Sequence, residues 1–371
     1  MVNRLKNALW LIVGAVVAVW ALTSLVGLVR AGDMDPPGPP GGTMKTLIAV
    51  EPRTPIWGPD PGDFPIVISQ PGSYYLGENI NGEADKDGIL IMADNVTLDL
   101  NGFTLKGADG KSSYNGITVP LDPTGVVYNL SIFNGTIRDW GNAGIAASSP
   151  NGEARNSQLR DLKVSGNRAD GVRVQEALVT GVVAIGNRKD GIKVGSGQVL
   201  DSSAVHNRQN GISLGVGEVR GCMATGNVWD GIEVQSSSLV VGNVASHNSQ
   251  DLQIFGGGHG IHVTGAQNRI EGNSASLNGG PGPIDSGGDG IHVTGGSNRI
   301  EGNDVQGNFL NQGPRGGHGI DSSVGSGVNL IIKNSASGNG AGNYVTHASD
   351  TVGPIETKLT PLGNPWANIS Y

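Results

Sequence analysis

The chain has 371 residues, of which 15% are charged, and a formal net charge of −8, which argues against nucleic acid as a partner. The single cysteine, Cys222, excludes an internal disulfide. Glycine is abundant, with 62 in the chain. Because interior glycine costs about 1 kcal/mol relative to alanine in a helix, this composition also argues against a helical fold.

The N-terminal segment differs from the rest of the chain. Residues 7–29 are uncharged and mostly apolar, and Arg4 and Lys6 precede them. The stretch is long enough to span a bilayer, and it equally fits a signal peptide cleaved after Ala31. Residues 1–31 are therefore a signal peptide or a membrane anchor. Both alternatives predict an extracytoplasmic protein: secreted, periplasmic, on the cell surface, or anchored in the inner membrane with the remainder outside. Membrane contact is expected only through residues 7–29, if they are uncleaved.

Two short regions precede the repetitive part of the chain. Residues 32–46 are rich in proline and glycine, which is typical of an extended linker. Residues 47–84 contain an amphipathic stretch and a Pro-Gly turn, and we expect them to form an N-terminal cap over the first repeat.

A short motif, in which glycine follows a small or polar residue and precedes Ile or Val, recurs along the chain. It reads DGILI at 87–91, NGITV at 115–119, AGIAA at 143–147, DGVRV at 170–174, DGIKV at 190–194, NGISL at 210–214, DGIEV at 230–234, HGIHV at 259–263, DGIHV at 289–293 and HGIDS at 318–322. The repeat is shortest between Gly171 and Gly231 and longer on either side. Periods of roughly 20–30 residues indicate a solenoid, because one repeat cannot bury its own apolar face.

The motif alternates with period 2, which is typical of a short strand. In the repeat at 190–194, Ile192 and Val194 should point inward and Lys193 outward. Short strands joined by tight corners within so short a repeat predict an all-β fold, a single-stranded right-handed parallel β-helix. We expect about ten turns over residues 85–347, with 348–371 as a C-terminal cap or tail.

Asparagines recur in two further columns. Asn243, Asn273, Asn303 and Asn334 follow one another with the period of the longer repeats, and Ser202 and Cys222 hold the same slot earlier. A second set precedes the motif glycines, at 167, 187, 207, 227, 248, 278, 308 and 339. We expect these side chains to form internal ladders, with asparagine and glycine at the corners because both tolerate the left-handed region.

Histidines are concentrated on three consecutive turns. Two neighbouring columns are expected, one of His259, Asp289 and His318 and one of His262, His292 and Asp321. Three interpretations stay open: an acid–base catalytic site, a divalent-cation site for calcium or zinc, or a solvated polar face produced by repeat duplication. No cofactor is established by the pattern alone.

Extra residues are inserted at one corner of these same turns. In the short repeats the turn asparagine closely precedes the motif glycine, as Asn207 precedes Gly211. The stretch from asparagine to glycine is about three times as long after positions 248, 278 and 308, and stacked insertions of this kind commonly build a binding surface. Candidate contacts on the insertions are Phe255, Phe309, Arg315, Asp251 and Asp285. Trp229 could stack on a sugar or pack under the first insertion.

The repeat over residues 85–345 resembles the parallel β-helix superfamily of pectate lyases, polygalacturonases, alginate epimerases and carbohydrate-binding repeat proteins. VEPRTPI at 50–56, PGSYYL at 71–76, DNVTLDLNGFTL at 94–105, VGPI at 352–355 and NPWANISY at 364–371 look like a group of secreted bacterial β-helix proteins defined by fold alone. Gly-His-Gly occurs at 258–260 and 317–319, but the other polygalacturonase motifs are missing. No complete family active site therefore transfers to this chain.

The resemblance implies an exported protein that binds or modifies polysaccharide, with lyase, epimerase or hydrolase chemistry in a groove on the C-terminal turns. Whether it is an enzyme stays open at this point. The alternative is a non-enzymatic structural or adhesion protein of the cell envelope, since the repeat is regular and no complete active site is visible.

Overall fold

The structure is a computed structural model, and it describes residues 13–18, 20, 51–108, 113–119, 126–149, 152–249, 258–280, 288–308, 317–325, 327–357 and 363–371. The chain divides into two compact units, 1–52 and 53–371. In the first unit, residues 13–18 and 20 are helical. Across the described residues, no helix is both long enough and apolar enough to cross a membrane. The predicted linker and most of the predicted anchor or signal segment lie outside them.

The second unit is built from short strands. In its N-terminal half they are β1 (Thr54–Ile56), β2 (Ile66–Ile68), β3 (Gly72–Leu76), β4 (Ile80–Asn81), β5 (Ile89–Ile91), β6 (Val96–Asp99), β7 (Thr104–Lys106), β8 (Ile117–Thr118), β9 (Val126–Tyr128), β10 (Ser131–Arg138), β11 (Ile145–Ser149), β12 (Gly152–Arg155), β13 (Ser157–Ser165), β14 (Val172–Thr180), β15 (Val183–Ile185), β16 (Ile192–Leu200) and β17 (Ser203–Val205). In the C-terminal half they are β18 (Ile212–Arg220), β19 (Met223–Thr225), β20 (Ile232–Val234), β21 (Leu239–Val241), β22 (Val244–Ser246), β23 (Ile261–Val263), β24 (Arg269–Glu271), β25 (Ser274–Ser276), β26 (Ile291–Val293), β27 (Arg299–Glu301), β28 (Asp304–Gln306), β29 (His318–Asp321), β30 (Leu330–Ile332), β31 (Ser335–Ser337), β32 (Gly342–Val345), β33 (Thr351–Val352), β34 (Ile355–Glu356) and β35 (Asn368–Ser370).

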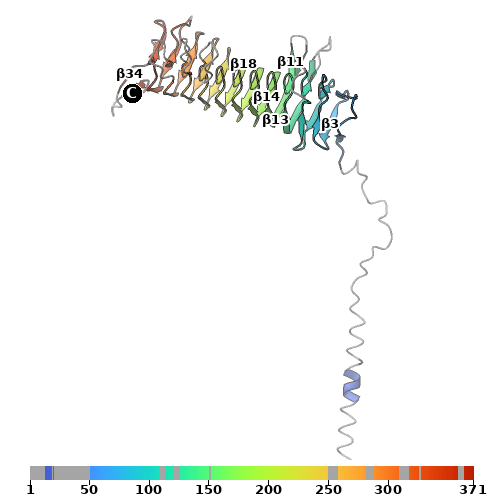
Figure 1. Cartoon of the computed structure of the whole chain (residues 1–371). Helices are drawn as coiled ribbons and strands as arrows, with labels where there is room; N and C mark the ends of the chain where they lie inside the picture. The colour runs from blue at the N-terminus through green and yellow to red at the C-terminus, as the bar shows by residue number, and fades with distance from the viewer. Residues whose placement is uncertain are drawn as a thin grey trace, which may run out of the picture. The chain divides into compact units, whose positions relative to one another are not determined.

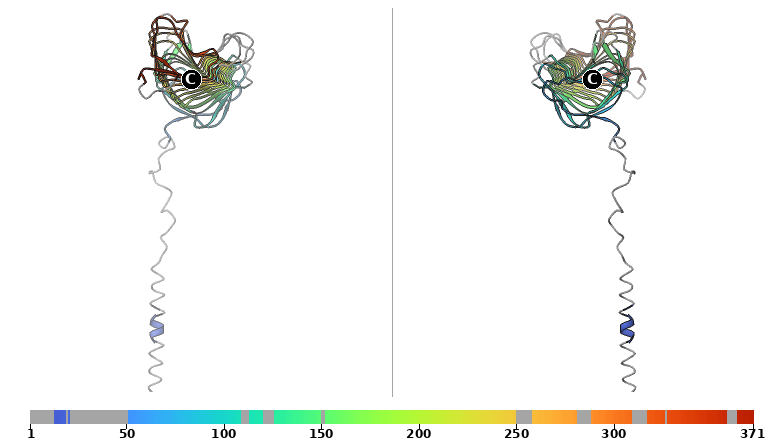
Figure 2. Two further views of the ribbon diagram at one scale, coloured as in Figure 1. Left: turned by 90° about the vertical axis from the view of Figure 1, so that its left-hand side faces the viewer. Right: turned by 90° about the vertical axis from the view of Figure 1, so that its right-hand side faces the viewer.

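These strands stack into a parallel β-helix, as the repeat predicts. The pairings between the described strands are parallel, with β11–β12 as the antiparallel exception. Figure 1 shows the turns following one another from β3 through β18 to β34, and end-on in Figure 2 they lie over one another. Residues one period apart become neighbours: Ile192 pairs with Ile212, and Ile232 with Ile261.

The core is a narrow aliphatic column inside the coil. Ile192 and Val194 are buried, whereas Lys193 between them is exposed, so the predicted alternation is confirmed. Burial of aliphatic side chains at about 25 cal/mol per Å² is the main favourable term of such a fold. The same alternation sets which side chains of the later motif strands face outward.

At two representative motif positions, close contacts leave room only for glycine. A Cβ added to Gly191 would lie 2.6 Å from Asn207 Nδ2, and one added to Gly260 would lie 2.6 Å from Asn278 Nδ2. Neither glycine has a left-handed φ, so the requirement is steric. The repeat therefore keeps glycine because the turn asparagine of the next turn occupies the space that a side chain would need.

The predicted asparagine ladders are confirmed. Asn243 Nδ2 donates to Asn273 Oδ1 at 2.9 Å, and Asn273 Nδ2 donates to Asn303 Oδ1 at 2.9 Å. Both asparagine and glycine were expected at left-handed corners, and this is confirmed for the glycines but wrong for the ladder asparagines. The residue before each ladder asparagine adopts that conformation, as at Gly242 (φ 64°) and Gly272 (φ 61°). The asparagine keeps ordinary geometry because its side chain must point inward to join the ladder.

Candidate histidine–aspartate site

The structure brings the six predicted His and Asp residues together on β23, β26 and β29 and the positions just before them. His262 pairs in register with His292, and His292 with Asp321. The residues just before the motif glycines form the adjacent column. The two expected columns are therefore present. The structure buries Asp321, at 7% exposure, although we expected an outward-facing residue there. The six residues are His259, His262, Asp289, His292, His318 and Asp321.

The column before the motif glycines is also a backbone ladder. The His259 N–H donates to Asp230 Oδ1 at 2.7 Å, and the His318 N–H donates to Asp289 Oδ1 at 2.7 Å. The same bond joins Asp190 N–H to Asp170 Oδ1 at 3.2 Å in turns without histidine. Asp230 and Asp289 thus each accept a backbone N–H of the next turn through Oδ1, which leaves Oδ2 available to a side chain.

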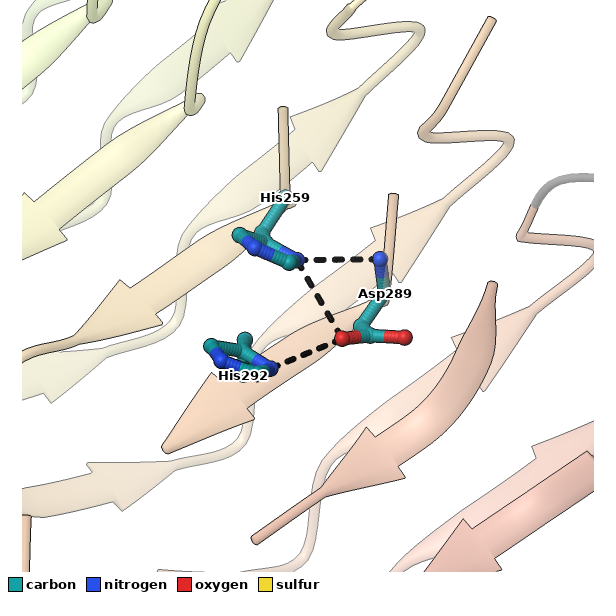
Figure 3. A group of neighbouring side chains, drawn as sticks. All are labelled: His259, Asp289 and His292. Carbon is teal, nitrogen blue, oxygen red and sulfur yellow. Dashed lines mark hydrogen bonds and ion pairs between the residues drawn. The ribbon is translucent and has the colours of Figure 1, made fainter. Parts of the chain in front are cut away.

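The second oxygens hold imidazoles. His262 Nδ1 lies 2.9 Å from Asp230 Oδ2, and His292 Nδ1 lies 2.8 Å from Asp289 Oδ2. Figure 3 shows His259 and His292 on the same side of Asp289, and their rings stack with centroids 4.3 Å apart. When a neutral imidazole donates through Nδ1, its Nε2 carries a lone pair, which suits a base or a metal ligand.

The local electrostatics favour charged His–Asp pairs. Burial opposes ionisation of Asp230, but the hydrogen bond and charge of His262 with the charge of His259 outweigh it and lower the pKa of Asp230. Burial likewise disfavours the charged form of His262, yet Asp230 raises the pKa of this imidazole overall.

Asp289 is the centre of the cluster. Burial disfavours its charge, but hydrogen bonds from His259, His292 and His318 hold the pKa of Asp289 far below its usual range. The hydrogen bond with Asp289 in turn raises the pKa of His318. The carboxylate is therefore ionised near neutral pH and attracts whatever positive charge the cluster can take up.

Two site residues were missed from the sequence. Asp230 holds His262 across the turns, and Glu233 pairs in register with His262. Burial, followed by the charge of Asp230, raises the pKa of Glu233. The repeat places both residues one turn before the histidines, and this spacing was the available signal. It could not show that His262 would reach back to Asp230, because that depends on a side-chain rotamer.

The other predicted contacts have mixed outcomes. Trp229, directly before Asp230, is 43% exposed, and residues 250–257 of the first insertion lie outside the described residues, so both stacking on a sugar and packing under that insertion stay open. Phe255, Phe309 and Arg315 lie outside the described residues, as do Asp251 and Asp285 in the same insertions.

Two groups of side chains have ligand atoms close enough to share an ion. In His259, Asp289 and His292 these atoms lie within 4.8 Å of one another, and the same holds for Asp289, His318 and Asp321. Nitrogen and carboxylate donors together fit the coordination preferences of zinc and related metals.

No protein-family model matches the chain, and no curated protein sequence matches it. Solved structures do. The Azotobacter vinelandii mannuronan C-5 epimerase AlgE6 A-module aligns with TM-score 0.55 and 18% identity over 81% of this chain and 91% of its own. The AlgE4 A-module from the same organism aligns with TM-score 0.50 and 17% identity over 81% of this chain and 87% of its own. At such identities the similarity establishes the fold alone, and this chain is a right-handed parallel β-helix protein.

Proposed function

We propose that this protein acts outside the cytoplasm on an acidic polysaccharide, using the His–Asp face to remove a proton from a uronate residue. The observation that carries the proposal is the Asp230–His262 pair. Its Nδ1–Oδ2 distance is 2.9 Å, and the side chain of His262 is 22% exposed while that of Asp230 is 12% exposed. A buried carboxylate that orients a more exposed imidazole is the arrangement required of a general base.

The chemistry follows from the acidity of the uronate C5 proton, which lies next to a carboxylate. His262 Nε2 would take this proton, and the electron pair of the C–H bond would pass into the carboxylate. Collapse of that anion with loss of the C4 oxygen substituent gives elimination and an unsaturated end. Return of a proton from water on the opposite face gives the epimer instead. Glu233 pairs in register with His262 and its pKa is raised by burial, so in the elimination it would donate a proton to the departing C4 oxygen on the side of the base.

The neighbouring turns offer cationic hydrogen-bond donors that could face the carboxylates of an acidic chain. Lys193 and Arg173 stand in the same outward column as Glu233 and His262, with side chains 50% and 32% exposed. Each also pairs with a buried aspartate, so its ammonium or guanidinium group is held in place. The names of the two aligned structures, both mannuronan C-5 epimerases, support a uronate polymer as the substrate class.

The test measures proton removal directly. Full-length protein is incubated in D₂O with polymannuronate, polyguluronate, polygalacturonate and a neutral glucan. Deuterium at C5 is followed by NMR, and unsaturated ends by ultraviolet absorbance. We expect deuterium exchange or unsaturated ends on at least one polyuronide and neither on the glucan. His262→Gln should lower the rate at least about 100-fold, the usual effect of losing a general base.

The matched control is His247→Gln. His247 is exposed at a corner of the same coil, and its left-handed φ of 54° is tolerated by glutamine elsewhere, as at Gln267 (φ 64°). This variant should keep the wild-type rate. Equal rates in wild type and His262→Gln would contradict the assignment of the base.

One observation favours a second function, a non-enzymatic protein of the cell envelope. The ladder that holds Asp230 and Asp289 also runs through Asp170 and Asp190, where no histidine is present, so these residues serve the scaffold as well. A wild-type protein that produces neither exchange nor unsaturated ends on any polymer would favour this alternative. The N-terminal sequence of the mature protein tests export: cleavage after Ala31 indicates release, and an intact N-terminus indicates an anchor.

A further inference from the structure

The buried aspartates of the outward face require a positive partner, and the identity of that partner changes along the coil. Asp170 pairs with Arg173 at 3.6 Å, and Asp190 with Lys193 at 3.2 Å. In the described part of the histidine turns, the ion pairs of Asp289 are with histidines instead. Since neutral imidazole supplies no charge, a buried carboxylate here needs a proton on histidine or a metal ion.

The donor atoms converge at separations that suit a small cation. Nδ1 of His259 and Nδ1 of His292 lie 3.3 and 2.8 Å from Asp289 Oδ2. Asp321 Oδ2 lies 3.8 Å from His292 Nδ1. Zinc bonds of about 2.0–2.2 Å in a tetrahedral site place ligand atoms about 3.3–3.6 Å apart. The observed separations bracket this range, so small side-chain adjustments would enclose an ion.

His259 shows why hydrogen bonding alone does not satisfy the cluster. Its Nδ1 accepts the Asp289 N–H at 3.1 Å, which requires a lone pair on that nitrogen. The same Nδ1 faces Asp289 Oδ2 at 3.3 Å, which requires a proton. No protonation state of the imidazole serves both contacts. A cation bound between Nδ1 and Oδ2 would take this lone pair in place of the Asp289 N–H and would replace the repulsion between the two atoms with two ligand bonds.

The remaining oxygen of Asp289 is already held by the next turn. The His318 N–H donates to Oδ1 at 2.7 Å, and His318 Nδ1 lies 3.2 Å from the same atom. These contacts fix the carboxylate and leave Oδ2 aimed at the two imidazoles. Such support by a second layer of hydrogen bonds is typical of metal-binding carboxylates.

We propose that the chain binds one divalent transition-metal ion of the zinc class, with His259, His292 and Asp289 as ligands and a fourth position open to water. Two nitrogens and one carboxylate match the borderline softness of zinc, cobalt and nickel. Calcium prefers six to eight oxygen ligands and is disfavoured here. This site is distinct from the Asp230–His262 pair, and it does not depend on any polysaccharide activity.

The test uses tag-free, full-length protein stripped with EDTA and titrated by calorimetry with zinc and, separately, with calcium. We expect one zinc per chain at micromolar affinity or tighter, with calcium at least 100-fold weaker. Cobalt in place of zinc should give the intense visible absorption of a four-coordinate site. Asp289→Asn should weaken zinc at least about tenfold while the ladder persists, because asparagine already fills this column at Asn210.

The matched control is Asp190→Asn, the same change in the same column outside the histidine cluster. It should bind zinc like the wild type. His292→Gln gives a second reading if Asp289→Asn does not fold, and it should also lose at least tenfold in affinity. Zinc binding weaker than about 100 μM, a preference for calcium, or an equal loss in Asp190→Asn would each overturn the proposal. Weak binding would mean that protonated histidine supplies the charge.

Discussion

Replacing Asn278 by alanine should lower the free energy of unfolding more than almost any other single substitution near the site. The side chain is completely buried and uses all of its hydrogen-bonding capacity. Nδ2 donates to Asn308 Oδ1 at 2.9 Å and to the Ala245 carbonyl at 3.0 Å. Oδ1 accepts the backbone N–H of Asn248 at 3.2 Å and its Nδ2 at 2.9 Å.

Alanine leaves those four partners buried without the bonds that Asn278 supplied. At about 1 kcal/mol or more for each lost bond, Asn278→Ala should lower the free energy of unfolding by about 4 kcal/mol. Urea unfolding followed by circular dichroism measures the change. Hydrogen exchange should locate it, since the amide of Asn248 loses its acceptor and should exchange faster than amides several turns away.

The control is Ser276→Ala, two positions earlier on the same turn, where the side chain is partly exposed. It should change stability by no more than about 0.5 kcal/mol. If Asn278→Ala costs less than about 1 kcal/mol, the hydrogen bonds of the internal ladder contribute little to stability, and the stability of the repeat would come from side-chain packing.

Three further predictions concern single positions. Gly260→Ala places a Cβ 2.6 Å from both a turn amide and a backbone carbonyl, so it should cost about 1–3 kcal/mol in urea unfolding, and a neutral effect would contradict the steric account. In EDTA-treated protein, Asp230 raises the pKa of His262 above 6.5, so the pair stabilises the fold fully below that pH and less as pH rises through the folded-state value. The stability gap between wild type and His262→Gln should therefore shrink on the alkaline side, and a constant gap from pH 6 to 9 would refute the pairing. Cys222→Asn should raise the free energy of unfolding by about 1 kcal/mol, because the asparagine side chain can donate to Asn243 Oδ1, which already accepts the N–H of residue 222 at 2.8 Å. A lower free energy of unfolding would show that the position is too small for asparagine.

Much of the fold was predictable because it repeats. Strand register followed from glycine spacing, since Ile192 pairs with Ile212 as expected from the interval between Gly191 and Gly211. The ladder through Asn243 and Asn273 followed from the same counting. The left-handed corner was expected at an asparagine or a glycine, and Gly272 takes that role, since spacing identifies a turn but does not say which of its residues reverses the chain.

The site was predictable as two columns and not as a set of bonds. His259 and Asp289 were expected to be neighbours, and they are. The link from His262 to Asp230 depends on a rotamer, and the burial of Asp321 depends on how the last turns close. Neither the contact nor the burial can be predicted from repeat length, because the direction of a side chain depends on its packing against several turns at once.

The backbone pairing between successive turns has a consequence for recognition. It fixes the height of a turn at the spacing of paired strands, about 4.8 Å, whatever residue stands outside. A partner can therefore contact several turns at once only if its own groups recur at a matching spacing. Each contact that forms raises the effective concentration of the partner's next group at the next turn. Compact molecules gain nothing from this arrangement, whereas a linear one with a commensurate period is held along its length.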